Sequence, residues 1–274
     1  MEIICIGNEL LIGKTLNTNA QWMAKRATSL GMLVKRITIV SDDVGEIANI
    51  VREALQRKPR FIITTGGLGP TFDDKTLQGI AKALNRKLKV NENALEMVKK
   101  KYEAYVKEEK MDKAELTPYR IKMATLPESA EPLPNPIGTA PGVIVNVEGT
   151  VLIALPGVPS EMEAIFEDSV VRLLWKEAEG VAFFERSIYV DNIMESNLAP
   201  LIGKAMHSNP YVYIKSHPRG EEEKPHIELH FSTTAKDSEI AKKRLENAIT
   251  QLSELVEKTG GKIKLQKRKA LTQP

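Results

Sequence analysis

The stretch FIITTGGLGPTFDDKT, residues 61 to 76, decides both the fold and the site that we expect. Phe61–Thr64 is apolar or β-branched, which predicts a short buried strand. Gly66, Gly67 and Gly69 follow, and glycine allows positive φ and a close approach of a ligand to the backbone. The loop leads into a predicted helix, whose N-terminal N–H groups attract anions. The stretch therefore predicts a phosphate-binding loop at the end of a strand, where open α/β sheets bind ligands.

Two carboxylates, Asp73 and Asp74, lie between this loop and the predicted helix. Mg²⁺ is typically held by one or two carboxylates together with phosphate oxygens. The pair therefore indicates a divalent cation beside the phosphate. The alternative is a tight turn with an N-capping aspartate. We favour the functional interpretation because glycines, proline and both acids fall together just after a strand end.

Length and composition indicate a globular chain. Its 274 residues are 42% hydrophobic and 27% charged, which suggests one large domain or two ordinary ones. The net charge is +3, and the stretch from Lys262 to Pro274 holds five basic residues and no acid. The basic excess thus lies in a tail, and we expect no nucleic-acid partner.

Cys5 is the only cysteine, which excludes a disulfide within the chain and favours a cytoplasmic location. No apolar run approaches the roughly 18 residues that cross a bilayer, so we expect no membrane partner.

The first ninety residues alternate short strands with helices. Strands are predicted over Glu2–Ile6, Met32–Val40 and Phe61–Thr64, and helices over Leu16–Leu30, Val44–Arg57 and Thr76–Leu84. This alternation predicts an α/β fold of three layers, a mostly parallel sheet with helices on both faces. Right-handed crossovers should bring the loops after the strands to one edge of the sheet. These loops are Gly7–Thr15, Ser41–Asp43 and Gly66–Asp74.

The second part of the chain contains a proline-rich stretch from Pro127 to Pro141, which excludes a helix or a central strand. Gly142–Val147 and Thr150–Leu155 predict a β-hairpin. A helix should start near Ser160, with Ser160 as N-cap and Glu163 completing a capping box.

A second domain is predicted from the order β-α-β-β-α-β after Gly180, which is the ferredoxin-like order. We therefore predict an α/β domain over 1–178, a small α+β domain over 179–266 and a basic tail over 267–274. His226 and His230 alternate with apolar residues, so they share one face of a strand and form no helical zinc site.

The loop GNELLIGKT, residues 7–15, has five residues between its glycines where a Walker A loop has four. Glu9, Lys14 and Asn17 can still reach a ligand, and the alternative is a packed loop whose polar residues face water. Asp42 and Asp43 end the second strand. A role as helix cap and a role with metal or ribose both remain open for this pair.

Four blocks of the sequence together resemble a known family. TTGGLGPTFDDKT resembles the signature of the molybdenum-cofactor biosynthesis fold, in which TGG-x-G is followed by Asp-x-Thr, and Asp74 and Thr76 occupy the latter positions. Three further blocks resemble the CinA proteins: GNELLIGKTLNTNAQWMAKRATSLG, NPIGTAPG and LPGVPSEM. The likeness is strong over residues 1 to 175.

The resemblance implies a molybdopterin-binding-like domain and a phosphate-bearing nucleotide or pterin ligand. In CinA-like proteins the domain is associated with hydrolysis of ADP-ribose-type pyrophosphates, and related domains bind or adenylylate molybdopterin. Full-length bacterial CinA proteins carry a further C-terminal domain that deamidates nicotinamide mononucleotide. This chain ends where that domain would begin, so we do not expect the deamidase activity.

These observations lead to the hypothesis of a nucleotide pyrophosphatase that uses Mg²⁺, Mn²⁺ or Co²⁺ to activate water. Asp74, Asp73 and Glu9 are the candidate catalytic residues, and Asp42 and Asp43 could join the two acids as metal ligands. The candidate ligand-binding residues are Thr65, Gly66, Gly67, Gly69, Thr76, Lys14, Asn17, Asn135, Thr139 and Glu161. Two alternatives stay open: binding or adenylyl transfer without hydrolysis, and a scaffold. A homo-oligomer is expected, with a dimer favoured.

Overall fold

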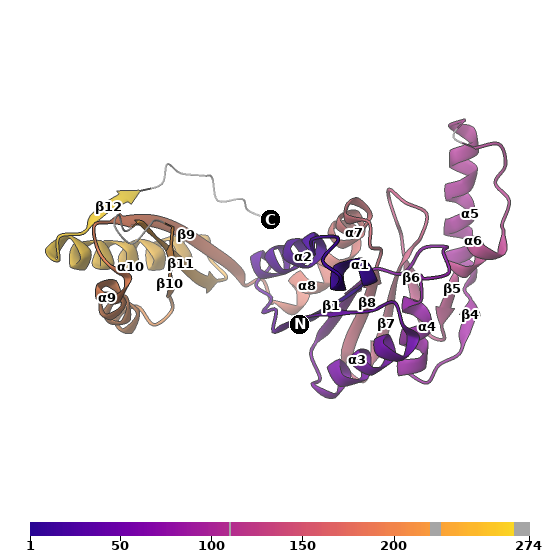
Figure 1. The fold of residues 1–274 in the computed structure, drawn as a ribbon, viewed down its shortest axis with the longest axis horizontal. Helices are drawn as coiled ribbons and strands as arrows, with labels where there is room; N and C mark the ends of the chain where they lie inside the picture. Colours follow the sequence, from indigo (N-terminus) through magenta and orange to yellow (C-terminus); the bar gives the residue numbers. More distant parts are fainter. Residues whose placement is uncertain (110, 220–225, 266–274) are drawn as a thin grey trace. The chain divides into compact units, whose positions relative to one another are not determined.

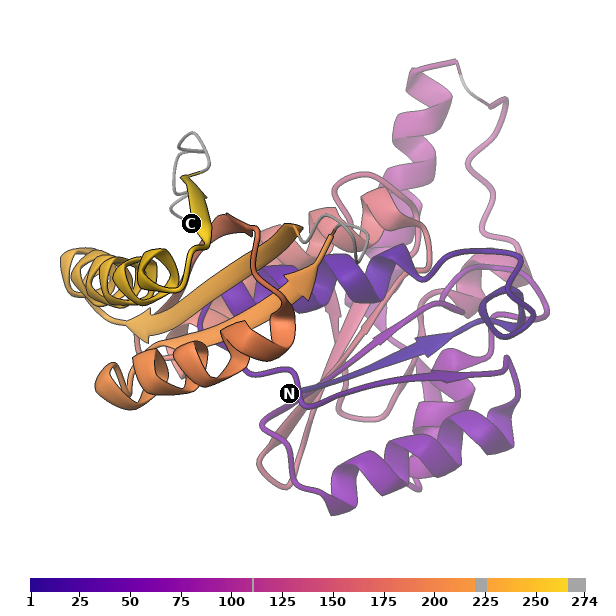
Figure 2. The ribbon, with the colours of Figure 1, turned by 60° about the vertical axis from the view of Figure 1, so that its left-hand side comes forward.

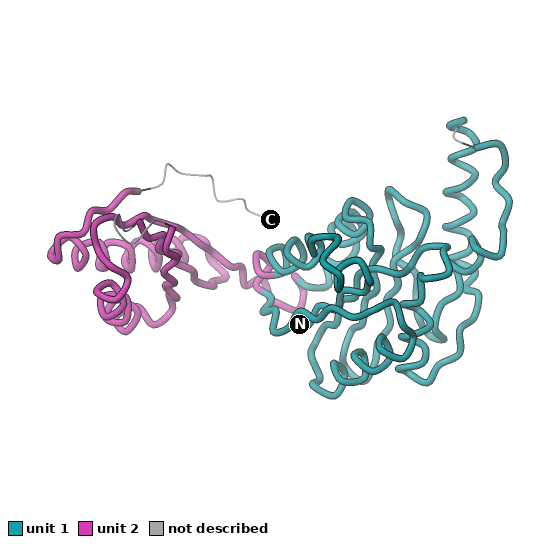
Figure 3. Tube along the Cα trace, in the orientation of Figure 1, with its two compact units in different colours: residues 1–27, 32–174 teal, residues 28–31, 175–274 magenta. Residues whose placement is uncertain are grey.

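The computed structural model describes residues 1–109, 111–219 and 226–265. The chain divides into two compact units, Met1–Ala27 with Met32–Leu174 and Thr28–Gly31 with Trp175–Pro274 (Figure 3). The predicted basic tail lies outside the described residues. No helix among the described ranges is long and apolar enough to pass through a membrane.

The first unit is built on a six-stranded sheet with the order β2-β1-β3-β8-β7-β6. Neighbouring strands from β2 to β8 pair in parallel, and β7 pairs antiparallel with both β8 and β6, so only β7 runs in the opposite direction, which confirms the predicted mostly parallel sheet. In chain order the strands are β1 (Glu2–Ile6), β2 (Arg36–Val40), β3 (Phe61–Thr65), β6 (Glu131–Leu133), β7 (Gly142–Val147) and β8 (Thr150–Leu155).

Helices cover both faces of this sheet, as predicted. Figure 1 shows α2 (Thr18–Ser29) and α7 (Pro159–Ile165) on one side, and α3 (Val44–Gln56) and α4 (Thr76–Ala83) on the other. Figure 2 shows the same layers from another direction. The alternation along β1 explains the arrangement, because Ile4 and Ile6 pack with the residues of α3 and α4 while Ile3 and Cys5 are buried on the opposite face.

The first unit also contains elements outside the six-stranded sheet. Residues 8 to 11 form the short helix α1 (Asn8–Leu11). Strands β4 (Leu88–Val90) and β5 (Thr125–Pro127) form a two-stranded sheet. In the sequence, α5 (Glu92–Lys107) and α6 (Pro118–Lys122) lie between these two strands. A π-helical turn (Phe166–Val170) leads from α7 into α8 (Val171–Glu177).

Two local predictions were wrong. β2 begins at Arg36 and not at Met32, because its partner β1 offers paired residues only from Glu2 onward. The predicted capping box at Ser160 does not form, since α7 already begins at Pro159, with Val158 as an N-cap that makes no side-chain hydrogen bond. Proline at the first helical position carries a φ suited to the helix and lacks an N–H that would need a cap.

The second unit has the predicted ferredoxin-like order. Its antiparallel sheet has the order β10-β11-β9-β12. His226 and His230 both lie on β11, and they contact Asp191 and Glu185 of β9. The elements are β9 (Ala182–Asp191), α9 (Glu195–Ser208), β10 (Tyr213–Pro218), β11 (His226–Ala235), α10 (Ser238–Lys258) and β12 (Lys262–Leu265).

An ion pair anchors the start of β1 to the end of α3. Arg57 donates from Nε and Nη2 to the two carboxylate oxygens of Glu2, at 2.8 and 2.7 Å, and Glu2 is only 4% exposed. We expect Arg57→Met to lower the free energy of unfolding by about 1–3 kcal/mol, because it leaves a buried carboxylate without its bidentate partner. The measurement is urea unfolding. The double variant Glu2→Gln/Arg57→Met should recover part of the loss, and a loss equal to or larger than that of Arg57→Met would contradict this account.

Candidate functional site

A cleft of about 430 Å³ lies at the carboxyl edge of the parallel strands. The loops after β1, β2, β3 and β8 all contribute to its walls, which confirms the predicted convergence. The loop before β7 reaches the same edge, because β7 runs antiparallel to β8 and begins where β8 ends.

The glycine loop is packed too tightly for side chains at its first two positions. Gly66 and Gly67 have φ of +108° and +65°. A Cβ on Gly66 would lie 2.1 Å from the carbonyl oxygen of Ile6, and a Cβ on Gly67 would lie 2.4 Å from Oγ1 of Thr76. Both positions therefore require glycine for backbone conformation and for space.

Hydrogen bonds divide the loop into an anchored part and an open part. The N–H of Gly66 donates to the carbonyl of Leu155 at 3.0 Å, so it is not available to a ligand. The N–H groups of Gly67, Leu68 and Gly69 make no hydrogen bond to any part of the chain that the structure describes. All three residues line the cleft. Successive unpaired backbone N–H groups in a loop of this kind are a candidate anion site.

The two threonines of the loop have structural roles. Thr76 is fully buried and donates from Oγ1 to the carbonyl of Gly66 at 2.7 Å, while its N–H donates to the carbonyl of Gly67. Thr65 donates from Oγ1 to the carbonyl of Pro156 at 2.8 Å. The hydroxyls of these two predicted ligand-binding residues thus hold the loop in place.

Asn19 is a site residue that the sequence analysis missed. Its Nδ2 donates to Oγ1 of Thr65 at 3.0 Å and to the carbonyl of Gly157 at 2.8 Å, which joins the loops after β3 and β8. Its Oδ1 is buried and has no partner among the described residues, although Asn19 lines the cleft. In the sequence, Asn19 could have been found only through its position in the CinA-like block GNELLIGKTLNTNAQWMAKRATSLG.

The carboxylates of Asp73 and Asp74 both contact the hydroxyl of Thr71. Oγ1 of Thr71 lies within hydrogen-bonding distance of both carboxylates, at 2.6 Å from Oδ2 of Asp74, and the N–H of Thr71 donates to the same Oδ2 at 2.8 Å. The pKa of Asp73 is lowered, first by this hydroxyl and further by the charges of Lys122 and Lys75. Both acids line the cleft.

Lys122 of α6 is a second residue that the sequence did not reveal. Its Nζ donates to the carbonyl of Thr71, so it supports the segment that carries the two acids. Burial lowers the pKa of Lys122, and the charges of Asp74 and Asp73 oppose that shift.

Asp42 and Asp43 have different partners in the structure. Oδ2 of Asp42 accepts the N–H of Asn8 at 2.8 Å, at the border of the cleft. Asp43 caps α3, accepting the N–H groups of Gly45 and Glu46, and these hydrogen bonds lower its pKa. Of the two alternatives for Asp43, the geometry matches the helix cap.

The described residues contain no group of three or more His, Cys, Asp or Glu that could hold a metal ion. The four predicted metal ligands therefore do not form one cluster. Asp73 and Asp74 alone suit a cation that completes its coordination with water and ligand oxygens, as Mg²⁺ does in phosphate sites.

The loop after β1 contributes two of its three predicted residues to the cleft. Glu9 lines the cleft, and its Oε1 lies 2.4 Å from where a Cβ on Gly7 would be, so the carboxylate folds back over that glycine. Asn17 also lines it, and Oδ1 of Asn17 accepts the N–H of Ala20 at 3.1 Å in the first turn of α2. Lys14 is exposed and does not line the cleft.

The far wall is organised by Asn135. Its Oδ1 accepts the N–H groups of Ile137 and Gly138, and its Nδ2 donates to Oε2 of Glu161 at 2.7 Å. Glu161 and Thr139 line the cleft, whereas Asn135 stands behind them. The three predicted residues therefore belong to one wall, with Asn135 in a supporting place.

Comparison with known proteins decides the family. A family model described as "Probable molybdopterin binding domain" matches residues 2–176. This chain belongs to that family. The similarity to relatives extends over the second unit as well: a protein of Aeropyrum pernix is 47% identical over 262 residues, 95% of each chain, and one of Sulfurisphaera tokodaii is 43% identical over 263 residues, 96% of this chain and 97% of the relative.

Among solved structures, the protein CinA from Thermoplasma acidophilum, described as of unknown function, is 44% identical with a TM-score of 0.56. The match covers 65% of this chain and 96% of that one. This confirms the resemblance to CinA. The molybdopterin biosynthesis enzyme MoaB from Thermus thermophilus matches at 15% identity and a TM-score of 0.40, over 64% of this chain and 95% of that one.

The crowding at Gly67 predicts a cost beyond backbone strain. Gly13 has a similar φ of +71°, but no atom lies within 4 Å of the place that a Cβ would take there, so it is a matched control. Gly13→Ala should cost about 1–2 kcal/mol of stability from the left-handed conformation alone. Gly67→Ala should cost about 1–3 kcal/mol more, because the new methyl group meets Thr76. Urea unfolding of the two variants measures the difference, and equal losses would show that crowding is unimportant.

Proposed function

We propose that the first unit hydrolyses the pyrophosphate of a nucleotide such as ADP-ribose or FAD. The observation that carries this proposal is the set of three unpaired N–H groups on Gly67, Leu68 and Gly69, beside the carboxylates of Asp73 and Asp74. N–H groups at a loop before a helix bind phosphate, and a carboxylate pair next to phosphate suits a divalent cation. Membership of a molybdopterin-binding family supports a phosphate-bearing ligand.

In this proposal, different residues bind the phosphate, hold the cation and activate the water. The N–H groups of Gly67, Leu68 and Gly69 bind one phosphate of the ligand. Asp73 and Asp74 would hold Mg²⁺, Mn²⁺ or Co²⁺, which when bound supplies charge neutralisation and a water of lowered pKa. Glu9, whose carboxylate also lines the cleft, orients the attacking water and takes its proton as the bond between the two phosphates breaks and AMP leaves.

The direct test is incubation of the protein with ADP-ribose or FAD in the presence of Mg²⁺, Mn²⁺ or Co²⁺, with release of AMP as the readout. We expect AMP only when a divalent cation is present. Well-folded protein that releases no AMP with any of the three metals would overturn the hydrolase proposal.

A second candidate function is binding or adenylyl transfer of a pterin-type cofactor without hydrolysis. The observation that favours it is the description of the matching family as molybdopterin-binding. It predicts tight binding of molybdopterin and no release of AMP from ADP-ribose. Calorimetry with both ligand classes, run beside the AMP assay, separates the two functions.

The acid pair gives a paired substitution test. Asp74→Asn should reduce AMP release by at least about a hundredfold with the fold intact, because the amide keeps the size of the side chain and removes the charge that would hold the cation. Asp43→Asn is the matched control, since asparagine is as good an N-cap as aspartate and should leave the rate unchanged. The measurement is the initial rate at saturating substrate. Equal rates for Asp74→Asn and the natural protein would remove Asp74 from the mechanism.

A further inference from the structure

The end of helix α6 contacts two separate segments that border the cleft. Lys122, the last residue of α6, donates from Nζ to the carbonyl of Thr71, in the segment that carries the acid pair. The next residue, Met123, accepts a hydrogen bond through Sδ from the hydroxyl of Thr139 on the far wall, at 3.9 Å. Met123 is buried in the core of the first unit. Two consecutive residues therefore hold the acid segment and the far wall from the same helix end.

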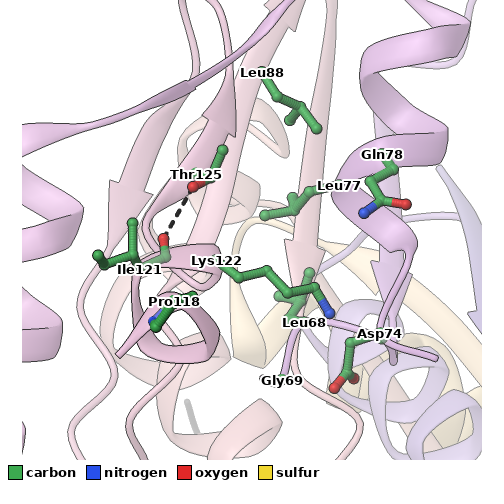
Figure 4. Close-up of a pocket in the computed structure, with 11 residues that line it drawn as sticks. Leu68, Gly69, Asp74, Leu77, Gln78, Leu88, Pro118, Ile121, Lys122 and Thr125 are labelled. Atoms are coloured by element: carbon green, nitrogen blue, oxygen red, sulfur yellow. Dashed lines mark hydrogen bonds between the residues drawn. The ribbon is translucent and has the colours of Figure 1, made fainter. Parts of the chain in front are cut away.

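The side chain of Lys122 follows a defined path to its partner. It extends along an apolar cavity of about 390 Å³ beside the glycine loop, which Leu77 and Ile121 also line (Figure 4). Figure 4 shows its ammonium directed toward Asp74. A lysine stem packed along apolar surface has few alternative paths, so the ammonium group reaches one place. Lys122 is thus suited to fix the position of the acid segment.

Helix α5 also contacts the far wall. Lys101 donates from Nζ to the carbonyl of Pro136 at 2.7 Å, and the hydroxyl of Tyr105 donates to the carbonyl of Ile137 at 3.5 Å. Both carbonyls belong to the loop that Asn135 organises. Proline has no N–H, so its carbonyl is the one backbone group through which this position can be held. The far wall is therefore held by α5 as well as by the end of α6.

The two helices are joined to each other. The guanidinium of Arg120 in α6 lies over the ring of Tyr102 in α5, 3.7 Å from the ring centroid. Figure 1 shows α5 and α6 side by side. Tyr102 also packs against the core of the first unit, and it directly follows Lys101 in the chain. A cation over an aromatic ring is an attractive contact, so a displacement of one helix is passed to the other.

We propose that the helix pair α5–α6 acts as a brace, and that Lys101 and Lys122 are positioning residues that fix the acid pair relative to the far wall. The inference rests on the proposed function for its kinetic readout. The glycine loop is anchored by other contacts, those with Thr76 and Leu155. Release of the brace should therefore leave phosphate binding intact and slow the reaction, because reactions depend steeply on the placement of the reacting groups.

The test substitutes each lysine in two ways. Lys101→Met and Lys122→Met keep an apolar stem and remove the hydrogen bond, whereas Lys101→Arg and Lys122→Arg keep a charge and donors. Lys100→Met is the matched control. Lys100 neighbours Lys101 on α5, its side chain is 71% exposed, and its ammonium pairs with Glu96 one turn away. Thermal unfolding first checks that all variants are folded.

The kinetic readout is AMP release from ADP-ribose. Lys101→Met and Lys122→Met should each lower kcat by at least about tenfold and change KM by less than about threefold. The arginine variants should recover most of the rate, and Lys100→Met should match the natural protein. An equal rate for Lys101→Met and Lys100→Met would overturn the positioning role of Lys101.

A double variant tests whether the two lysines act through one brace. Lys101→Met/Lys122→Met should lose less than the product of the two single losses, because the second substitution acts on a brace that is already released. A loss equal to that product would show that the two lysines act independently and would overturn the brace.

Hydrogen exchange gives a readout that needs no turnover. The N–H of Thr71 is bonded to Asp74, and the N–H groups of Ile137 and Gly138 are bonded to Asn135, so both segments hold protected amides. Each methionine variant should speed exchange by at least about threefold over residues 71–76 and also over residues 135–140. Faster exchange confined to the segment that the substituted lysine contacts would overturn the coupling.

The outcomes separate this inference from the proposed function. AMP release by the natural protein, with kcat and exchange unchanged in both methionine variants, would overturn the brace and leave the hydrolase standing. Faster exchange in both segments, from a protein that releases no AMP with any of the three metals, would support the brace and overturn the proposed function. No AMP release and no change in exchange would overturn both.

Discussion

The hydrogen bond from the Thr76 hydroxyl to the carbonyl of Gly66 is the contact on which the site depends. It holds the glycine loop against the first turn of α4, while the N–H of Gly66 is bonded to Leu155 of β8. These two contacts fix the start of the loop to both the helix α4 and the sheet. The N–H groups of Gly67, Leu68 and Gly69 are left without partners among the described residues. The three unpaired N–H groups are thus a direct consequence of how the loop is anchored, and the proposed anion site requires no charged side chain of its own.

The acids beside this loop explain why a cation belongs in the proposed function. The pKa of Asp73 is lowered by Thr71, Lys122 and Lys75, so its carboxylate is ionised at neutral pH. A phosphate brought next to two carboxylates would be repelled unless positive charge lay between them. The ammonium of Lys122 is engaged by the carbonyl of Thr71. The charges of Lys122 and Lys75 offset part of this repulsion, and a divalent ion shared by Asp73, Asp74 and the ligand would offset more of it.

The sequence predicted the frame of the site better than its side chains. Hydrophobic alternation and glycine positions led to the parallel sheet, the edge at which loops converge and the hairpin over residues 142–155. Lys122 could not be found this way, because it reaches the loop through the pairing of β4 with β5, strands of only three residues with little periodicity. Asp42 and Asp43 are identical in chemistry, and only backbone geometry assigns one to the cleft and the other to a helix cap.

A site that binds phosphate through backbone N–H groups has little chemical selectivity by itself. Pyrophosphates, nucleotides and phosphorylated pterins all present similar oxygens to it, which is consistent with one family fold serving several ligands. Discrimination must then come from side chains that flank the loop. Leu68 and Leu77 line an apolar cavity beside the loop. Asp73, Asp74 and Glu9 offer the groups on which a reaction would depend. In the proposed function, substitutions at Asp74 should therefore change whether a bound ligand reacts.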